Sequence, residues 1–293
     1  MTQRADEFEA HRPHIFGIAY RMLSSVADAE DIVQDTYLRF AATPQESIRS
    51  VPALLTTIVT RLCLNFLQSA RVRRETYVGP WLPEPLLAAS TYSQNGSEPL
   101  SHLAEVETIS MAFLVLLERL TPLARAVFIL REVFDYDYSE IGAIVEREPT
   151  TCRQIFSRAR KELAQGERRF RPSDEDHQRI LLSFMQAVTR GDMASLTDML
   201  AEDVVMWADG GGKVRGAATR PLYGREPVAT FLVSSTRFIA SELSSFEVVT
   251  LNAQPAVIIR DAGRPVVVVS TDVDEFQIRT LRLIANPDKL RRL

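Results

Sequence analysis

The residues with the clearest chemistry lie between Pro149 and Lys161, where basic and hydrogen-bonding side chains recur on one face of a predicted helix. Pro149 followed by Thr150 and Thr151 is a helix start, and apolar residues at three-to-four spacing define a buried face. Such a helix, about 10 to 12 Å across, enters a DNA major groove about 12 Å wide. The predicted DNA-contacting residues are Thr150, Thr151, Arg153, Gln154, Ser157, Arg158 and Lys161. The alternative is a solvated basic face on an ordinary amphipathic helix.

The preceding stretch decides between these interpretations. Residues 138–145 predict a short helix, and Glu146, Arg147 and Glu148 predict a three-residue turn before the basic helix. A helix, a short turn and a basic second helix have the spacing of a helix-turn-helix, which favours a DNA-contacting role. The turn contains no glycine, although a non-glycine residue at positive φ is uncommon.

An acidic surface is predicted near the start of the chain. The apolar pattern of residues 8–40 indicates two helices with a break near Ser24 and Ser25. The second helix carries Asp28, Asp31, Gln34 and Asp35. The helix dipole accounts for acidity only in the first turn, so the remaining carboxylates favour a basic or polar protein partner.

A third helix is predicted from Val51 to an arginine cluster. Its polar face includes Thr56 and Thr60 among other threonine, asparagine and arginine residues. Such side chains suit contact with a DNA backbone or with unpaired bases, while a solubilising helix end is the alternative. The candidate contacts are Thr57, Arg61, Asn65, Arg71, Arg73 and Arg74.

The whole-chain totals exclude several classes of protein. A chain of 293 residues with 46% hydrophobic and 25% charged residues is typical of two or three soluble domains. A net charge of −4 argues against non-specific coating of nucleic acid. Cys63 and Cys152 fall on apolar helix positions, as expected for buried thiols in the cytoplasm. No apolar run approaches the roughly 20 residues of a spanning helix, so we expect no membrane span. The four histidines are scattered without partners at metal spacing, so we expect no metal site, and we expect no cofactor or catalytic site either.

A proline-rich linker is predicted over residues 75–107. It contains the sequence Trp-Leu-Pro-Glu-Pro at residues 81–85. An exposed indole would leave a large apolar area in water, so we expect this segment to dock on another domain. A locally collapsed loop is the alternative.

The last third of the chain predicts an α+β domain. Two helices are expected over residues 176–189 and 193–200, followed by a block of strands that would form a curved antiparallel sheet with room for a small ligand. The predicted strands are 204–207, 214–215, 246–251, 256–260, 265–270 and 277–284. The glycines within residues 209–213 predict a hairpin turn.

Several of these motifs, in this order, resemble the extracytoplasmic-function sigma factors. The resemblance rests on the acidic run Asp28–Arg39, the basic-ended third helix, and residues 138–141 leading to Ser157-Arg158-Ala159-Arg160. It implies a region-two domain whose Asp28, Asp31, Gln34 and Asp35 bind the clamp helices of RNA polymerase core. It also implies that the third helix holds the −10 promoter element and that residues 150–161 read the −35 element.

The C-terminal part resembles the SnoaL-like, cone-shaped α+β domains. In the sigma factors that carry such a domain it is taken to regulate the sigma part in cis. The domains expected are region two (1–74), the linker (75–107), region four (108–171) and the SnoaL-like domain (172–293). The implied interdomain or regulatory residues are Trp81, Pro83, Glu84, Asp209, Gly210, Gly211, Lys213, Asn286, Pro287, Asp288 and Lys289.

Two rival functions remain open from the sequence. A cone-fold isomerase or hydrolase with a DNA-binding appendage would use Asp203, Asp209 or Asp272 as a base, although no second acid or histidine accompanies them at a recognisable spacing. A DNA-binding repressor would bind its operator without polymerase. The favoured hypothesis is a cytoplasmic, non-enzymatic sigma factor with two all-α domains and a C-terminal α+β cone.

Overall fold

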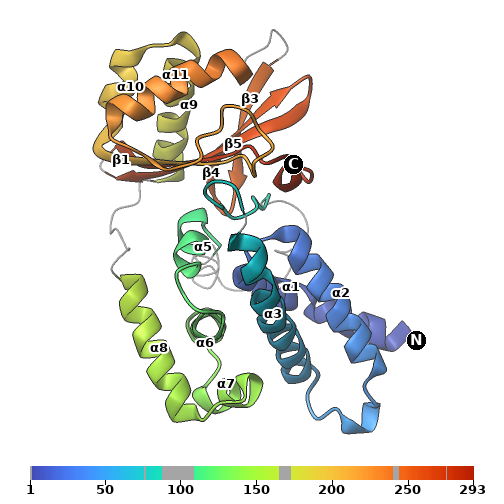
Figure 1. Cartoon of the computed structure of the whole chain (residues 1–293). Helices are drawn as coiled ribbons and strands as arrows, with labels where there is room; N and C mark the ends of the chain where they lie inside the picture. Colours follow the sequence, from blue (N-terminus) through green and yellow to red (C-terminus); the bar gives the residue numbers. More distant parts are fainter. Residues whose placement is uncertain (1, 76, 88–108, 165–172, 240–243, 275) are drawn as a thin grey trace. The chain divides into compact units, whose positions relative to one another are not determined.

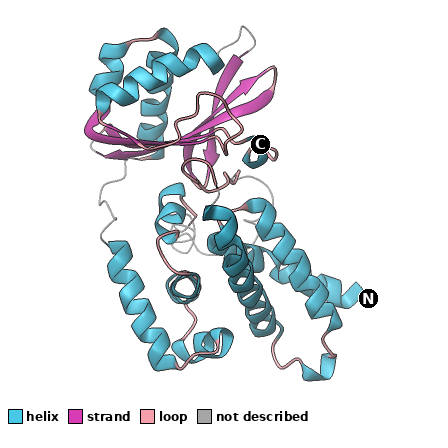
Figure 2. Ribbon diagram, viewed as in Figure 1, coloured by secondary structure: helices cyan, strands magenta, loops and turns pink. Residues whose placement is uncertain are grey.

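The computed structural model describes residues 2–75, 77–87, 109–164, 173–239, 244–274 and 276–293. The chain divides into two compact units (Figures 1 and 2). The first unit holds Met1–Arg73 and Ala89–Glu167, and the second holds Arg74–Ala88 and Arg168–Leu293. The linker segment Arg74–Ala88 therefore groups with the C-terminal domain and not with the helices that it connects.

Three long helices begin the first unit: α1 (Thr2–Leu23), α2 (Val26–Ala42) and α3 (Val51–Glu75), with a 3-10 turn at Gln45–Ser47. The predicted break between α1 and α2 occurs at Ser24, which adopts φ 56°, and the Ser25 side chain then accepts a hydrogen bond from Asp28 N. Ser25 thus satisfies one of the free amides at the start of α2. Ile15, Ile18, Met22 and Phe40 are fully buried.

Helix α3 differs from expectation in two respects. Thr56 and Thr60, predicted on its polar face, are fully buried. Residues Val51–Ser69 are also long and apolar enough to cross a membrane by length and composition, with a mean hydropathy of 1.3. Leu55, Val59 and Cys63 of this stretch are buried in the first unit, as in the core helix of a folded domain.

Four further helices complete the described part of the first unit: α5 (Met111–Leu117), α6 (Pro122–Glu132), α7 (Tyr138–Val145) and α8 (Pro149–Ala164). Pro122 lies in the first turn of α6 and Thr121 caps it. Arg125 is 3% exposed, pairs with Glu118 at 2.8 Å and donates to Met22 O at 2.7 Å. This buried guanidinium joins α6 to the end of α1.

The second unit is the predicted α+β domain. Helices α9 (Asp174–Arg190), α10 (Met193–Met199) and α11 (Arg225–Ile239) cover one face of a curved sheet (Figure 1). The sheet order is β2-β1-β6-β5-β4-β3. The strands are β1 (Leu200–Asp209), β2 (Leu222–Tyr223), β3 (Ser244–Leu251), β4 (Gln254–Asp261), β5 (Arg264–Asp274) and β6 (Gln277–Ile284), followed by a 3-10 turn at Pro287–Lys289.

Three details of this domain correct the sequence-based expectations. The sheet is mixed and not antiparallel, because β1 pairs in parallel with β6. Residues 214–215 form a turn and not a strand, because glycines at positive φ interrupt the chain on both sides. Helix α11 was not predicted at all, and it forms because Val228, Ala229 and Leu232 pack into the core of the cone.

Candidate nucleic-acid interface and linker clasp

Helix α7 is fixed by its own N-terminus. Asp137 accepts a hydrogen bond from Glu140 N at 2.8 Å, and Glu140 Oε2 accepts one from Asp137 N at 2.9 Å. This reciprocal pair is a capping box. The bond from Glu140 N, with one from Ser139, holds the pKa of the Asp137 carboxyl below its usual value. The start of this short helix is therefore fixed by side-chain hydrogen bonds.

The turn between α7 and α8 uses a left-handed glutamate. Glu146 closes α7 at φ 57° and ψ 52°. The following amide, Arg147 N, donates to Gly142 O at 3.0 Å. A side chain at Gly142 would meet Arg147 O at 2.5 Å, so glycine is required there instead. The helix-turn-helix expected from the sequence thus forms with its close approach at Gly142 and its positive φ at Glu146.

Replacing Glu146 with glycine is expected to stabilise this turn by about 1 kcal/mol relative to replacing it with alanine, because only glycine adopts the left-handed region without steric cost. Both substitutions remove the same carboxylate, so alanine is the matched control. Amide hydrogen exchange of α7 and α8 in the full chain measures the difference. Equal protection in the two variants would contradict the assigned geometry.

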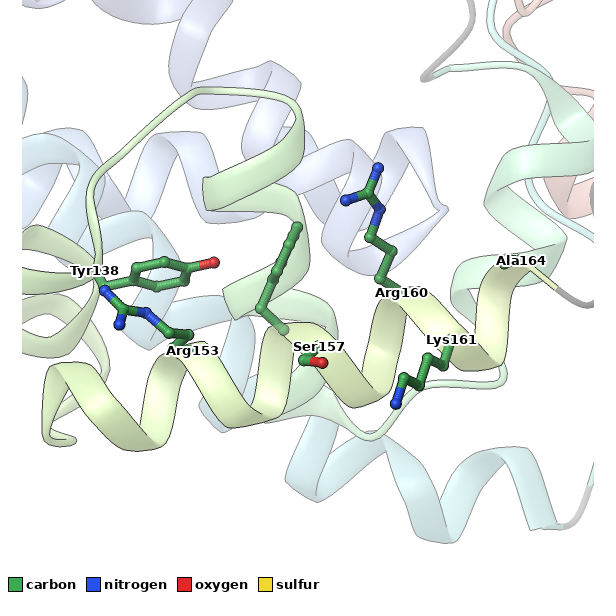
Figure 3. Close-up of a pocket in the computed structure, with 7 residues that line it drawn as sticks. Tyr138, Arg153, Ser157, Arg160, Lys161 and Ala164 are labelled. Atoms are coloured by element: carbon green, nitrogen blue, oxygen red, sulfur yellow. The ribbon is translucent and has the colours of Figure 1, made fainter.

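Helix α8 presents the predicted basic face to solvent. Thr150, Arg153, Gln154, Ser157, Arg158 and Lys161 are exposed, Thr151 is half-buried, and Cys152, Ala159 and Leu163 are buried. Phe156 stacks on Phe128 with ring centroids 5.7 Å apart. The Arg153 guanidinium lies 5.3 Å from the Tyr138 ring centre, beside a surface pocket that Ser157, Arg160 and Lys161 also line (Figure 3). A hydrogen-bonding, cationic surface suited to phosphates and base edges therefore faces outward.

The acidic surface of α2 is also exposed. Asp31, Gln34 and Asp35 point to solvent, whereas Asp28 is half-buried at the helix start. Leu38 lies on the same face at helical spacing and is 58% exposed. This face of α2 therefore presents carboxylates and one apolar side chain to solvent. Sequence reasoning missed Leu38, although its spacing from Asp31, Gln34 and Asp35 was visible.

The predicted contacts of α3 divide into three groups. Asn65 is exposed, and Thr57 Oγ1 donates to Ala53 O at 2.7 Å. The side chains of Arg71, Arg73 and Arg74 lie outside the described residues. Arg61 contacts the end of α7: its Nε donates to Ile144 O at 3.0 Å and its Nη2 to Ala143 O at 3.1 Å. Arg61 Nη2 also lies 3.1 Å from Glu146 Oε1.

His14 of α1 makes a second contact between the first three helices and the segment that precedes α7. Its Nε2 lies 3.3 Å from the Tyr136 hydroxyl and 3.5 Å from Thr56 Oγ1, and its ring meets the edge of Phe134. Burial, with the nearby positive charges of His11 and Arg21, lowers the pKa of His14 to about 4. The imidazole is therefore neutral at neutral pH in this arrangement.

Acidification is expected to destabilise the helices around His14. The folded pKa of about 4 lies below the unfolded value near 6.5, so the unfolded chain binds more protons between these pH values. The stabilisation is complete above pH 6.5 and is lost as the pH falls toward 4. Amide exchange of residues 15–23 at pH 7 and pH 5, corrected for intrinsic rates, measures this loss. His14→Gln should show a smaller change than the wild type, and an equal change would contradict the assignment.

The second unit holds the linker through one buried aspartate. Asp209 is 0% exposed; its Oδ2 accepts hydrogen bonds from Leu82 N at 2.9 Å and Lys289 Nζ at 2.7 Å. Its Oδ1 accepts from the Tyr77 hydroxyl and from Gly211 N. Lys289 also donates to Leu82 O. We call Tyr77, Trp81, Leu82, Asp209, Asn286 and Lys289 the linker clasp.

Aromatic rings surround the ion pair of the linker clasp. Lys289 Nζ lies 4.1 Å from the Trp81 ring centre, and Asn286 Nδ2 donates to the Tyr77 hydroxyl at 2.8 Å. A cation over an indole face gains electrostatic attraction, about 2 kcal/mol where the pair is desolvated. Burial and the hydrogen bond to Asp209 raise the pKa of Tyr77, so its hydroxyl stays a donor. Every charge in the clasp therefore has a partner.

The linker also pairs with the edge of the sheet. Leu87 forms an antiparallel bridge with Leu251 at the end of β3. Asn252 N donates to Leu86 O at 2.8 Å, and Asn252 Oδ1 accepts from Leu86 N at 3.0 Å. Asn252 and Ala253 both have positive φ, as a two-residue hairpin turn requires. Asn252 thus forms the hairpin turn and also binds the linker backbone at Leu86. Sequence reasoning missed this contact, and it also missed the contact of Tyr77 with Asp209.

The other residues implied by the SnoaL-like resemblance lie close to the clasp. A side chain on Gly211 would overlap Asn286, and one on Gly210 would meet Ala217. Lys213 forms an exposed ion pair with Asp288, which keeps the pKa of that carboxyl low. Pro83 and Glu84 are buried, and Pro287 begins the final 3-10 turn. The three motifs, distant in sequence, meet at one place in the second unit.

The three aspartates considered as catalytic bases are each ion-paired. Asp203 pairs with Arg279 at 2.9 Å, Asp272 forms two bonds with Arg282, and Asp209 binds Lys289. None of them lines the cavity of the cone. With their carboxylates held by arginine or lysine and directed away from the cavity, this arrangement does not favour acid-base chemistry on a ligand in the cone.

Comparison with known proteins identifies the family. Residues 8–73 match the model for Sigma-70 region 2, and residues 110–163 match the model for Sigma-70 region 4. The chain is 34% identical to the ECF RNA polymerase sigma factor SigJ of Mycobacterium tuberculosis over 97% of this chain and 92% of that protein. The chain belongs to the extracytoplasmic-function sigma factors. As a sigma factor it carries both helical regions and a fused SnoaL-like domain, which confirms the predicted fold class.

Two further similarities agree with the family. The crystal structure of SigJ from Mycobacterium tuberculosis matches this sigma factor with a TM-score of 0.75 and 30% identity, over 98% of each chain. The probable sigma factor SigI from the same species is 29% identical over 66% of this chain and 65% of its own length. The similarity to SigJ extends through the C-terminal domain, whereas the match to SigI covers about two thirds of the chain.

Proposed function

We propose that this sigma factor directs RNA polymerase core to specific promoters and that its C-terminal domain controls this activity through the linker clasp. Promoter-specific initiation is the function of its family. The observation that carries the second part is the burial of Asp209 against linker residues, because the linker joins the two sigma regions. Proteins of this family are not enzymes, and we propose no catalytic activity and a cytoplasmic location for this chain.

Each exposed surface receives one role in this proposal. The Asp28, Asp31, Gln34 and Asp35 surface of α2, together with Leu38, binds the clamp helices of the polymerase. Thr57, Arg61, Asn65 and the arginines that follow contact the −10 element. The exposed face of α8 reads the −35 element, with Arg153 and Arg158 contacting bases or phosphates. Shape and charge support these roles: carboxylates face a protein partner and cations face DNA.

Arg61 connects the two parts of the proposal. Its guanidinium donates to the carbonyls of Ala143 and Ile144, so it is occupied in the structure described. A −10 contact by Arg61 requires its release from α7. We therefore assign this arrangement of the first unit to the resting protein. Because the linker joins the two sigma regions, a linker held by the clasp limits how far these regions separate.

Reconstituted transcription tests the sigma assignment. Core polymerase and the full chain are incubated with a promoter library, and the initiated transcripts are sequenced. We expect initiation at a small set of promoters that share −10 and −35 elements. Asp31→Lys with Asp35→Lys should abolish initiation, whereas Glu175→Lys, an exposed charge change in α9, should leave it unchanged. Binding of promoter DNA without any initiation would favour the repressor alternative.

A further inference from the structure

Tyr138, the first residue of α7, was not among the predicted DNA contacts, yet its ring lies beside Arg153 of α8 (Figure 3). The Arg153 guanidinium carbon lies 5.3 Å from the ring centre, and that of Arg131, on α6, lies 5.4 Å from it. Both distances are within the range of about 6 Å over which a ring face attracts a cation. Side chains from α6, α7 and α8 therefore meet at one tyrosine.

The Tyr138 ring is held in place by its neighbours. Asp137, the preceding residue, caps α7 and fixes its start. The rings of Tyr138 and Phe156 pack edge to face with their centroids 6.1 Å apart, and Phe156 in turn stacks on Phe128 of α6. The tyrosine is half-buried in this packing. Its ring is therefore a fixed part of the helix-turn-helix and not a free surface side chain.

The two arginines at this ring differ in their other contacts. Arg131 donates to Tyr136 O at 2.9 Å and pairs with Asp135 at 3.3 Å, so its own polar contacts anchor it. Arg153 is exposed and makes no hydrogen bond or ion pair in the part of the chain that the structure describes. The ring of Tyr138 is therefore the contact that orients the Arg153 guanidinium.

A ring contact leaves the hydrogen-bonding capacity of an arginine intact. The guanidinium group has five N–H donors, and a contact with ring carbon uses none of them. Arginine reads guanine through two bonds, to O6 and N7, which require one orientation of the guanidinium plane. Holding this long side chain in that orientation before DNA binds reduces the rotamer entropy that is lost when the bonds form.

From these features we infer that Tyr138 is a positioning residue for promoter recognition: its ring holds Arg153 in the orientation that reads one guanine of the −35 element. Tyr138 acts through Arg153, so it sets the preference at a single base position and not the general affinity for DNA. This inference rests on the proposed contact between α8 and the −35 element.

The size of the expected effect follows from the strength of a cation–ring contact. At an exposed site such a contact corresponds to about two- to fivefold in an equilibrium constant. Leucine in place of Tyr138 offers no ring face, and the surface pocket beside Arg153 gives the guanidinium room to leave its orientation. The loss should therefore appear as weaker discrimination between bases at the position that Arg153 reads.

Transcription by core polymerase and the full chain tests the inference, on promoters in which each −35 position carries each of the four bases. The position read by Arg153 is the one whose preference Arg153→Ala removes. We expect Tyr138→Leu to lower the guanine preference there by about two- to fivefold and to leave the other positions unchanged. Tyr138→Phe retains the ring and should keep the wild-type preference. In the Arg153→Ala background, Tyr138→Leu should have no further effect, which also controls for damage to the fold.

Three results would overturn the inference: an unchanged preference in Tyr138→Leu, an equal loss in Tyr138→Phe, or a further loss of initiation from Tyr138→Leu in the Arg153→Ala background. The last result would mean that the tyrosine contacts DNA or supports the fold by itself. If Tyr138→Leu does not fold, Tyr138→Met replaces it with the same expectation.

The same measurement separates this inference from the proposed function. If Arg153→Ala changes no base preference, the proposed −35 contact of Arg153 fails, and the role of Tyr138 fails with it. If Arg153 sets a base preference that does not depend on Tyr138, only the positioning role is overturned.

Discussion

Replacing Asp209 with asparagine is expected to lower the free energy of unfolding of the C-terminal unit by about 3 to 5 kcal/mol. Lys289 is 9% exposed, and its ammonium is balanced by the Asp209 carboxylate. The substitution keeps the size of the side chain and removes its charge, so the buried Lys289 ammonium loses the carboxylate that balances it. Removing one partner of a buried ion pair is costly for this reason.

Urea unfolding of the full chain, followed by tryptophan fluorescence, measures this effect. Both tryptophans, Trp81 and Trp207, lie in the second unit, so the signal reports that unit. The matched control is Asp288→Asn, because Asp288 also pairs with a lysine but its side chain is 43% exposed. Exposed pairs contribute about 0 to 1 kcal/mol. Similar losses in the two variants would show that Asp209 does not anchor the clasp.

Replacing Arg158 with alanine is expected to reduce initiation from the cognate promoters by about 5- to 150-fold, corresponding to about 1 to 3 kcal/mol. Arg158 is exposed on α8, on the side away from the buried Cys152, Ala159 and Leu163. If it contacts a base edge, the loss is accompanied by relaxed preference at one promoter position. If it contacts a phosphate, all promoters weaken alike and the salt dependence decreases.

The control for Arg158 is Arg190→Ala, which removes the same charge from an exposed position at the end of α9. Quantitative transcription from the promoter library, at two salt concentrations, separates the base and phosphate outcomes. Normal initiation by Arg158→Ala together with normal initiation by Arg153→Ala would mean that another face of α8 meets the DNA.

Local signals in the sequence predicted much of this structure. The bounds of α7 and β6 are those expected, because both segments have a clear apolar period and clear end signals. Helix α11 was missed because valine, threonine and serine have weak helix propensity, and the helix is stabilised by packing in the core. The parallel pairing of β1 with β6 is a long-range choice that no local pattern encodes.

The candidate sites also divide into features that local sequence predicts and features that depend on long-range packing. The exposed faces of α2 and α8 follow directly from helical spacing, so their residues could be named from the sequence. The clasp was named only in part: its motifs were visible, but the role of Tyr77 depends on the fold bringing residues 77–87 onto the sheet. The contact of Asn252 with the linker, outside the clasp, depends on the same packing. Likewise, nothing local predicts that Arg61 binds the carbonyls at the end of α7.

The central claim is that holding the linker on the C-terminal domain restrains initiation, and one redox measurement tests it directly. Leu87 and Leu251 form a non-hydrogen-bonded antiparallel pair, whose Cα separation of about 4.5 Å permits a disulfide in Leu87→Cys/Leu251→Cys. The native Cys63 and Cys152 are both buried, and Leu87→Cys alone controls for oxidation. We predict that oxidation of the double variant lowers initiation from the cognate promoters and that reduction restores it. Equal initiation in the oxidised and reduced forms would contradict control through the linker.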